Sequence, residues 1–219
     1  MAHSTSGHGR IESARQRSQF WDRHALGYDR FVAGSGKGYS EMLSLTEAAL
    51  RPGGRVLEVA AGTGNLALQI SPSAERVFAT DLSFQMLEIA RDKARVQAQV
   101  NIDFQVQDAL ALAFPDAAFD TVICANVLHI LSDPKGVLKE VYRTLKPGGQ
   151  LIAPHYLHGL NFRVQIVSRL LRLIGFRVFH RFDRSSFQEL LLTAGFVDVA
   201  LTLIPGLLPI GFVQCQKRG

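Results

Sequence analysis

The most constraining part of this 219-residue chain runs from Val56 to Ala67, where an apolar segment containing Glu58 turns through Gly62 and Gly64 into a second apolar segment. A chain that leaves a buried strand and turns sharply into a helix brings its backbone close to a ligand. Glycine permits that approach because it has no Cβ atom. The spacing G-x-G-x-x-A is typical of a strand-turn-helix unit that binds a nucleotide-sized ligand.

Two carboxylates decide between the ligands that fit this turn, which are NAD and S-adenosylmethionine. Glu58 lies inside the expected strand, where a dinucleotide-binding strand is normally apolar. A buried carboxylate is costly without a partner, so we expect Glu58 to meet the ammonium group of S-adenosylmethionine; a structural pairing with Arg55 or Arg76 is the alternative. Asp81 ends the next apolar run, where an acid accepts hydrogen bonds from both ribose hydroxyls.

Apolar runs alternate with amphipathic segments, which predicts an α/β fold with a mostly parallel sheet and helices on both faces. The turn at Pro205-Gly206 is too short for a parallel crossover, so the last two strands form an antiparallel hairpin, which argues against a dinucleotide fold. A capping box over 186–189 predicts one further helix, ending at Gly195. The other expected helices lie near 64–70, 83–97 and 134–145, and the strands near 55–60, 76–81, 102–107, 119–126, 149–155, 197–204 and 209–216.

Together these motifs resemble the class I S-adenosylmethionine-dependent methyltransferases, especially the small-molecule branch (methyltransferase type 11) that includes the enzymes of ubiquinone and menaquinone biosynthesis. The resemblance extends from about Phe20 to Gln216. It implies a Rossmann-like seven-stranded sheet with an antiparallel last strand, a helical cap from the N-terminus and an insertion after strand five. One departure is Ala60-Ala61, where the family often has glycine followed by cysteine or serine.

The resemblance also implies a set of cofactor-binding residues, with Asp108 similar to the acid that binds adenine and Tyr28 on a helix that closes over the cofactor. The implied set is Tyr28, Glu58, Ala60, Gly62, Thr63, Gly64, Asp81, Leu82, Met86, Asp108, Ala109, Asn126 and Val127. Methyl transfer needs mainly positioning and exclusion of water, so the catalytic residue stays unassigned. Candidate bases follow strands four and five: His129, His155 and Tyr156. No metal is expected, because no cluster of acids with an adjacent asparagine occurs there.

Length and composition fit one methyltransferase domain over 11–219, after a disordered lead over 1–10. Within this domain we expect an N-terminal helical lid over 11–45 and a basic helical cap over 156–186. The cap contains six arginines and one acid, an excess that equals the net charge of the whole chain, +5. Such a cap suits an anionic acceptor or an anionic membrane surface. Nucleic acid is disfavoured, because 126–129 lacks the Pro-Pro-aromatic signature of base methylation and no aromatic stacking platform is visible.

The expected location is the cytoplasm, with peripheral membrane contact through the basic cap. No secretion signal and no membrane-spanning apolar run is present, and Cys124 and Cys215 lie in apolar runs as small hydrophobic residues. The predicted function is methyl transfer to a small-molecule or lipid-like acceptor by in-line displacement. Three alternatives stay open: a phospholipid N-methyltransferase at the membrane surface, a non-catalytic cofactor-binding protein, and a nicotinamide-dependent reductase.

Overall fold

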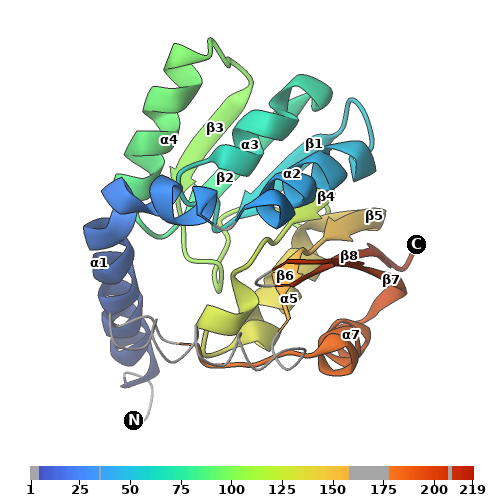
Figure 1. The fold of residues 1–219 in the computed structure, drawn as a ribbon. Coiled ribbons are helices and arrows are strands. Elements are labelled where there is room, and N and C mark those ends of the chain that lie inside the picture. Colours follow the sequence, from blue (N-terminus) through green and yellow to red (C-terminus); the bar gives the residue numbers. More distant parts are fainter. Residues whose placement is uncertain (1–4, 35, 158–177, 207–208) are drawn as a thin grey trace.

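The computed structural model describes residues 5–34, 36–157, 178–206 and 209–219, with side chains from Ala14 onward. Helices and strands alternate through most of the chain (Figure 1). The described strands are β1 (Arg55–Val59), β2 (Arg76–Asp81), β3 (Ile102–Val106), β4 (Phe119–Ile123), β5 (Leu145–Ile152), β6 (His155–Tyr156), β7 (Phe196–Ile204) and β8 (Ile210–Lys217). The described helices are α1 (Thr5–Ala33), α2 (Lys37–Ala49), α3 (Asn65–Ile70), η1 (Ser71–Ser73), α4 (Phe84–Val96), η2 (Leu128–Ile130), α5 (Pro134–Thr144) and α7 (Arg184–Thr193).

All described strands belong to one sheet in the order β3-β2-β1-β4-β5-β8-β6, with β7 also paired to β8. Strands β1 to β5 run parallel, whereas β8 is antiparallel to both β5 and β7. The predicted Rossmann-like sheet with an antiparallel last strand is therefore confirmed. The eighth strand, β6, adds only two residues beside β8.

The central strands of the sheet are buried on both faces, because neighbouring residues of these strands enter two different hydrophobic clusters. On β1, Val56 packs on the face that α2 and α3 cover, and Leu57 packs on the face that α5 and α7 cover. This two-sided burial is typical of parallel sheets, whose crossover helices cover both faces. Glu58 follows the alternation of the strand and points to the same face as Val56. The carboxyl ends of β1, β2 and β4 meet along one edge, where ligands bind in such sheets.

The structure corrects three expected element boundaries. Strand β4 ends at Ile123 rather than near 126, and the chain then passes through Asn126, whose backbone is left-handed (φ 52°). The strand expected near 149–155 is divided into β5, which already begins at Leu145, and the short β6. The expected capping box at 186–189 is wrong by three residues: Asp183 is the N-cap of α7, and its carboxylate accepts a 2.8 Å hydrogen bond from the Ser186 amide.

The N-terminal helix α1 begins at Thr5, inside the segment assigned to a lead over 1–10. It stands at one side of the molecule beside α4 (Figure 1). Of the basic cap expected over 156–186, residues 158–177 lie outside the described residues. None of the helices within the described ranges is both long and apolar enough to cross a membrane.

Candidate functional site

The turn between β1 and α3 has the left-handed backbone that its glycines permit. Gly62 has φ 56° and Gly64 has φ 75°. At Gly64 a Cβ atom would lie only 2.7 Å from the Cβ of Ala90 on α4, so this position needs glycine for helix packing as well as for its backbone. Ala60 adopts φ 59° in the same turn, a conformation that costs an alanine free energy.

Asp81, at the end of β2, is joined directly to this turn. One carboxylate oxygen accepts a 2.8 Å hydrogen bond from the amide of Gly62, and the other accepts a 2.8 Å hydrogen bond from the amide of Ser83. Burial raises the pKa of Asp81 despite these amides, and the residue is 9% exposed. The next residue, Leu82, leads into α4, where Met86 is fully buried. The structure therefore brings Gly62, Asp81 and the start of α4 together at one sheet edge.

Glu58 is a buried carboxylate whose Oε2 atom has no hydrogen-bond partner. The residue is 3% exposed, and burial raises its pKa to about 8 although a backbone hydrogen bond from Ala67 opposes the shift. The arginines proposed as structural partners lie elsewhere: the guanidinium groups of Arg55 and Arg76 lie 5.2 and 5.6 Å from the ring centre of Phe78. An oxygen that has lost its water and has no donor in the protein fits a ligand cation.

Helix α1 lies over the same sheet edge and contacts several residues expected to bind the cofactor. Atom Cε1 of Tyr28 is 3.5 Å from the position that a Cβ on Gly62 would occupy. Earlier on the helix, Arg17 forms a 3.0 Å ion pair with one oxygen of Asp108, and the other oxygen accepts from the amide of Leu110. The expected lid and the expected adenine-binding acid are therefore in direct contact.

Two further contacts of α1 were not expected from the sequence. The carboxylate of Asp22 accepts from the hydroxyl of Ser83, the N-cap of α4. The carboxylate of Asp29 accepts a 2.6 Å hydrogen bond from the hydroxyl of Thr63, inside the glycine turn. No motif indicates either contact; the only sequence signal is an acidic residue on a helix expected to cover a ligand.

Tyrosines from three elements gather around Glu58, and one of them, Tyr39 on α2, was missed by the sequence analysis. Burial raises the pKa of Tyr39 to about 12, with contributions from the charge of Glu58 and from Tyr156. Burial, Tyr39 and Tyr156 likewise raise the pKa of Tyr28 far above its usual value. The phenols of Tyr28 and Tyr39 therefore stay neutral near pH 7 and can act as hydrogen-bond donors or acceptors beside the carboxylate.

The segment after β4 contributes Asn126 to the same region of the site. Its side-chain oxygen accepts a 3.1 Å hydrogen bond from the amide of Tyr156, and its amide nitrogen lies 3.6 Å from the sulfur of Met42 on α2. Val127 is buried and, with Ala109, packs on the cluster of the opposite sheet face. Of Asn126, Val127 and Ala109, Asn126 is therefore the residue whose side chain makes polar contacts, one of them to Met42 on α2.

The candidate bases are separated by the sheet. The rings of His129 and His155 meet edge to face at 4.8 Å, and His155 also stacks on Phe187 at 4.7 Å. Tyr156 packs instead against the cluster of the opposite face, as expected for neighbouring residues on a strand. The structure thus brings the two histidines together with aromatic side chains and places Tyr156 with the tyrosines near Glu58.

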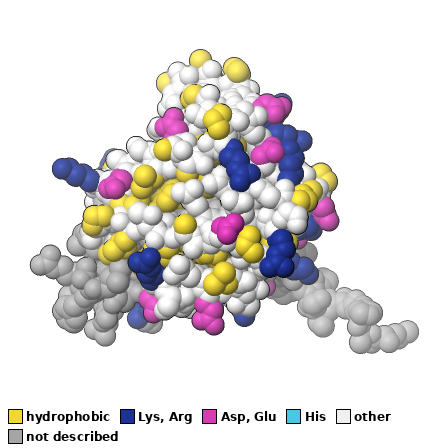
Figure 2. Space-filling view, turned by 90° about the vertical axis from the view of Figure 1, so that its right-hand side faces the viewer, with side chains coloured by type: hydrophobic (Ala, Val, Ile, Leu, Met, Phe, Trp, Pro, Cys, Tyr) yellow, Lys and Arg dark blue, Asp and Glu magenta, His cyan; other side chains and the backbone are white. Residues whose placement is uncertain are grey.

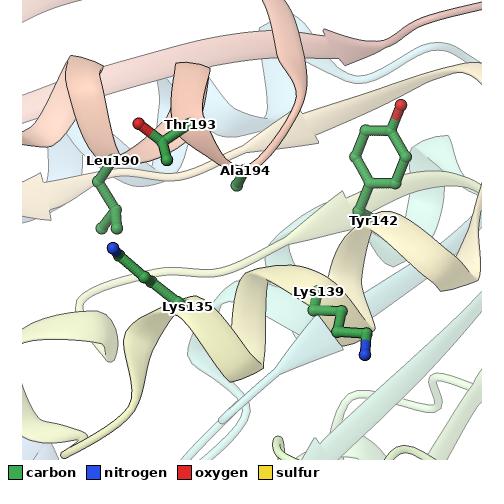
Figure 3. A pocket seen from close by; sticks show the side chains of 6 residues that line it. All are labelled: Lys135, Lys139, Tyr142, Leu190, Thr193 and Ala194. Carbon is green, nitrogen blue, oxygen red and sulfur yellow. The ribbon is translucent and has the colours of Figure 1, made fainter.

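Other surfaces of the molecule lie apart from the candidate site around Glu58 and the glycine turn. A groove between α5 and α7 contains Lys135 and Leu190, which point toward each other, whereas Lys139 points away from α7 (Figure 3). On the face in Figure 2, basic and acidic side chains are scattered among hydrophobic ones and form no single charged patch. Among residues 5–34, 36–157, 178–206 and 209–219, no three His, Cys, Asp or Glu side chains are grouped to hold a metal ion.

Comparison with known proteins identifies the central part of the chain. Residues 57–153 match the family model of a methyltransferase domain. A demethylmenaquinone methyltransferase of Thermus thermophilus is 41% identical over 130 residues, which cover 55% of this chain and 58% of that protein. The chain spans about half the length of the curated relatives it matches.

Solved structures show the same fold. The YcgJ protein from Bacillus subtilis has a TM-score of 0.68 at 21% identity, over 82% of this chain and 99% of that one. A phosphoethanolamine N-methyltransferase of Haemonchus contortus, solved in complex with S-adenosyl-L-methionine, has a TM-score of 0.69 at 18% identity, over 82% of this chain and 53% of that one. Residues 57–153 are therefore a methyltransferase domain, in a chain that has the class I fold and is similar in sequence to small-molecule methyltransferases of quinone biosynthesis.

Proposed function

We propose that this chain is an S-adenosylmethionine-dependent methyltransferase that acts on a small, quinone-like acceptor. The observation that carries the proposal is the junction of β1, β2 and α3, where Gly62 donates to Asp81 beside Glu58. Bound there, S-adenosylmethionine supplies an electrophilic methyl group on a sulfonium ion. The similarity to a demethylmenaquinone methyltransferase supports the choice of acceptor class.

The residues present fit this cofactor. The oxygen of Glu58 that has no partner is suited to an ammonium group, and the carboxylate of Asp81 is suited to ribose hydroxyls. We propose that the backbone of the glycine turn lies close to the bound ligand. The remaining expected contacts, from Leu82, Met86, Asp108, Ala109, Asn126 and Val127, are part of the same proposal.

The chain contributes to the reaction chiefly by positioning. The carbon–sulfur bond breaks as the bond to the acceptor forms, and the electron pair of the broken bond stays on sulfur. Helix α1 and the tyrosines near Glu58 exclude water and hold the acceptor, effects that in general lower a barrier by up to about 7–11 kcal/mol. Methylation of a quinol carbon also needs the ring hydroxyl to be deprotonated, and the proton on the methylated carbon moves to that oxygen as the ring becomes aromatic again. His129 and His155 are the candidates to accept the hydroxyl proton, and Tyr156 is a candidate only as a phenolate.

A product assay tests this proposal. The purified protein is incubated with S-adenosylmethionine and a reduced quinone that lacks the ring methyl group, and S-adenosylhomocysteine and the methylated ring are quantified by mass spectrometry. We expect both products in equal amounts. Phosphoethanolamine and simple thiols serve as comparison acceptors. Product from one of these alone would overturn the acceptor class, and no product together with no S-adenosylmethionine binding would overturn the function.

The predicted contact between the basic segment and an anionic membrane concerns residues that lie mostly outside the described ones. It stays a prediction from composition, and so does the cytoplasmic location. Co-sedimentation with vesicles that contain phosphatidylglycerol, which should weaken as salt is added, tests it independently of activity.

A further inference from the structure

Helix α1 is attached to the glycine turn through two consecutive residues. Tyr28 lies against Gly62, and Asp29 bonds to the next residue of the turn, Thr63. Consecutive helical residues point about 100° apart, so the two side chains contact the turn from different directions. This arrangement fixes the rotation of α1 about its own axis as well as its distance from the turn.

The bonds of Asp29 form a closed polar network with three partners on three elements. One carboxylate oxygen accepts from the hydroxyl of Thr63 at 2.6 Å and from the side-chain amide of Asn65 at 3.0 Å. The other oxygen forms a 2.6 Å ion pair with Lys93 of α4. Lys93 in turn donates to the side-chain oxygen of Asn65 at 2.8 Å and to the backbone carbonyl of Thr63 at 3.1 Å. Thr63, Asn65 and Lys93 are therefore each bonded to another of these partners as well as to Asp29.

The charge on Asp29 is part of this network. Partial burial by itself raises the pKa of its carboxyl group, but hydrogen bonds from Lys93, Thr63 and Asn65 together with the charge of Lys93 lower the pKa overall. The side chain of Asp29 is 40% exposed and that of Lys93 is 24% exposed. Ion pairs as exposed as this one contribute little to global stability. Their effect is expected on local opening of the segment that they fasten.

We propose that Asp29 is a positioning residue for the cofactor: through Thr63, Asn65 and Lys93 it fastens α1 to the glycine turn and so keeps Tyr28 over Gly62. The inference rests on the proposed function, because it assigns the turn to cofactor binding. It adds a second role for the lid. Besides covering the proposed cofactor site, α1 sets the shape of the glycine turn.

The chain contains its own probe for this inference. Trp21 is the single tryptophan of the sequence and lies on α1, with its ring 6.1 Å from the ring of Tyr28. The fluorescence of Trp21 therefore reports the position of α1 next to the proposed cofactor site. The chain also offers a matched control, the i,i+3 ion pair of Asp92 and Arg95 on α4, whose side chains are 71% and 78% exposed.

The test compares Asp29→Asn, Lys93→Met and the control Asp92→Asn with the wild type. Dissociation of S-adenosylhomocysteine is followed by stopped-flow fluorescence of Trp21, its affinity by calorimetry and global stability by urea unfolding. We expect each of the first two variants to bind about tenfold more weakly and to release the ligand faster, with the unfolding midpoint unchanged. The double variant should be no worse than either single variant, because both remove the same network. Asp92→Asn should behave as the wild type.

Each outcome decides the inference. Unchanged affinity and dissociation in Asp29→Asn, or additive effects in the double variant, would overturn it while leaving the proposed function intact. Equal loss of binding in Asp92→Asn would also overturn it. If the wild type itself does not bind S-adenosylhomocysteine, the proposed function fails and this role falls with it. Amide hydrogen exchange of the free protein then still decides whether Asp29 fastens α1: exchange over 17–33 should be faster in Asp29→Asn than in the wild type.

Discussion

Asp81 accepts a 2.8 Å hydrogen bond from the backbone amide of Gly62, a residue that lies 19 positions earlier and on the neighbouring strand-turn unit. This bond holds the ends of β1 and β2 at the spacing that one ligand can bridge. The carboxylate that is expected to bind the ribose thus also shapes the turn that approaches the rest of the ligand. Substitution of Asp81 should therefore affect both the proposed ribose contact and the shape of the glycine turn.

Asp81→Asn should weaken binding of S-adenosylhomocysteine by about 1.5–3 kcal/mol, because charge-assisted hydrogen bonds to the ribose are lost. Isothermal calorimetry measures this directly. The matched control is Asp120→Asn, at the opposite end of the sheet, where the carboxylate bonds to Lys146 and to the amide of Arg55. That variant should lose stability but keep its affinity. Equal affinity in Asp81→Asn and the wild type would remove Asp81 from the site.

Gly64→Ala should destabilise the protein by about 3 kcal/mol or more, because it combines a left-handed backbone with a clash. The new Cβ would lie 2.7 Å from Ala90, on a helix that packs against the sheet. Gly53→Ala isolates the backbone contribution, since Gly53 has φ 71° but no atom within 4 Å of the Cβ position. It should cost about 1–2 kcal/mol. Urea unfolding of both variants tests the difference, and equal losses would contradict the packing role of Gly64.

Ala60→Gly should stabilise the fold by about 0.5–1 kcal/mol, because glycine adopts φ 59° without the strain that alanine carries there. The gain is smaller than the strain, since glycine also raises the entropy of the unfolded chain. Ala61→Gly is the control: this buried neighbour has an ordinary backbone, so the same change should destabilise by a similar amount. A lower unfolding temperature for Ala60→Gly would show that Ala60 is not strained.

Glu58 should make stability fall as pH rises from about 4.5 to about 8. Burial raises its pKa to about 8 in the folded protein from its ordinary value of 4.5. Between these two pKa values the folded state keeps a proton that the unfolded state releases. The contribution of Glu58 to stability is therefore fully present below pH 4.5 and is lost as pH rises through about 8. The slope approaches about 1.4 kcal/mol per pH unit. Glu58→Gln should flatten the profile in urea unfolding at pH 5 to 8.5; a parallel profile would contradict the shift.

Binding of an ammonium group beside Glu58 should release a proton at neutral pH. The cation favours the ionised carboxylate and so lowers the raised pKa of Glu58. Calorimetric titrations of S-adenosylhomocysteine at pH 7 in two buffers with different ionisation enthalpies measure the number of protons released. The wild type should release more than Glu58→Gln does, and identical proton release would place the ammonium group elsewhere.

The sequence predicts the sheet well because the signals for each strand and turn lie within short segments of the chain. Apolar runs define β1, β2 and β4, and the short Pro205-Gly206 turn requires the antiparallel hairpin whichever other elements surround it. Glu58 and Asp81 are recognisable for a similar reason, since Glu58 is a carboxylate inside a buried strand and Asp81 is a carboxylate at the end of one. Strand ends can be read from the pattern, and parallel strands bring their ends to a common edge.

The network of Asp29 with Lys93 is not local, and no pattern predicts it. The two residues lie on helices α1 and α4, and their pairing depends on how α1 docks. Tyr39 was missed for the same reason, because α2 brings it to Glu58 from a segment without a motif. The cap of α7 was misplaced because Ser186 and Glu189 have the spacing of a capping box, whereas the carboxylate of Asp183 is the acceptor in the structure.

Strand β8 has a consequence for biosynthesis. It comes from the C-terminal end of the chain, yet it lies inside the sheet between β5 and β7, and Lys217 at its end donates to the carbonyl of Leu145. During translation the flank of β5 stays without its neighbour until residues 210–217 have left the ribosome. Until then the nascent protein exposes an open sheet edge, which invites aggregation.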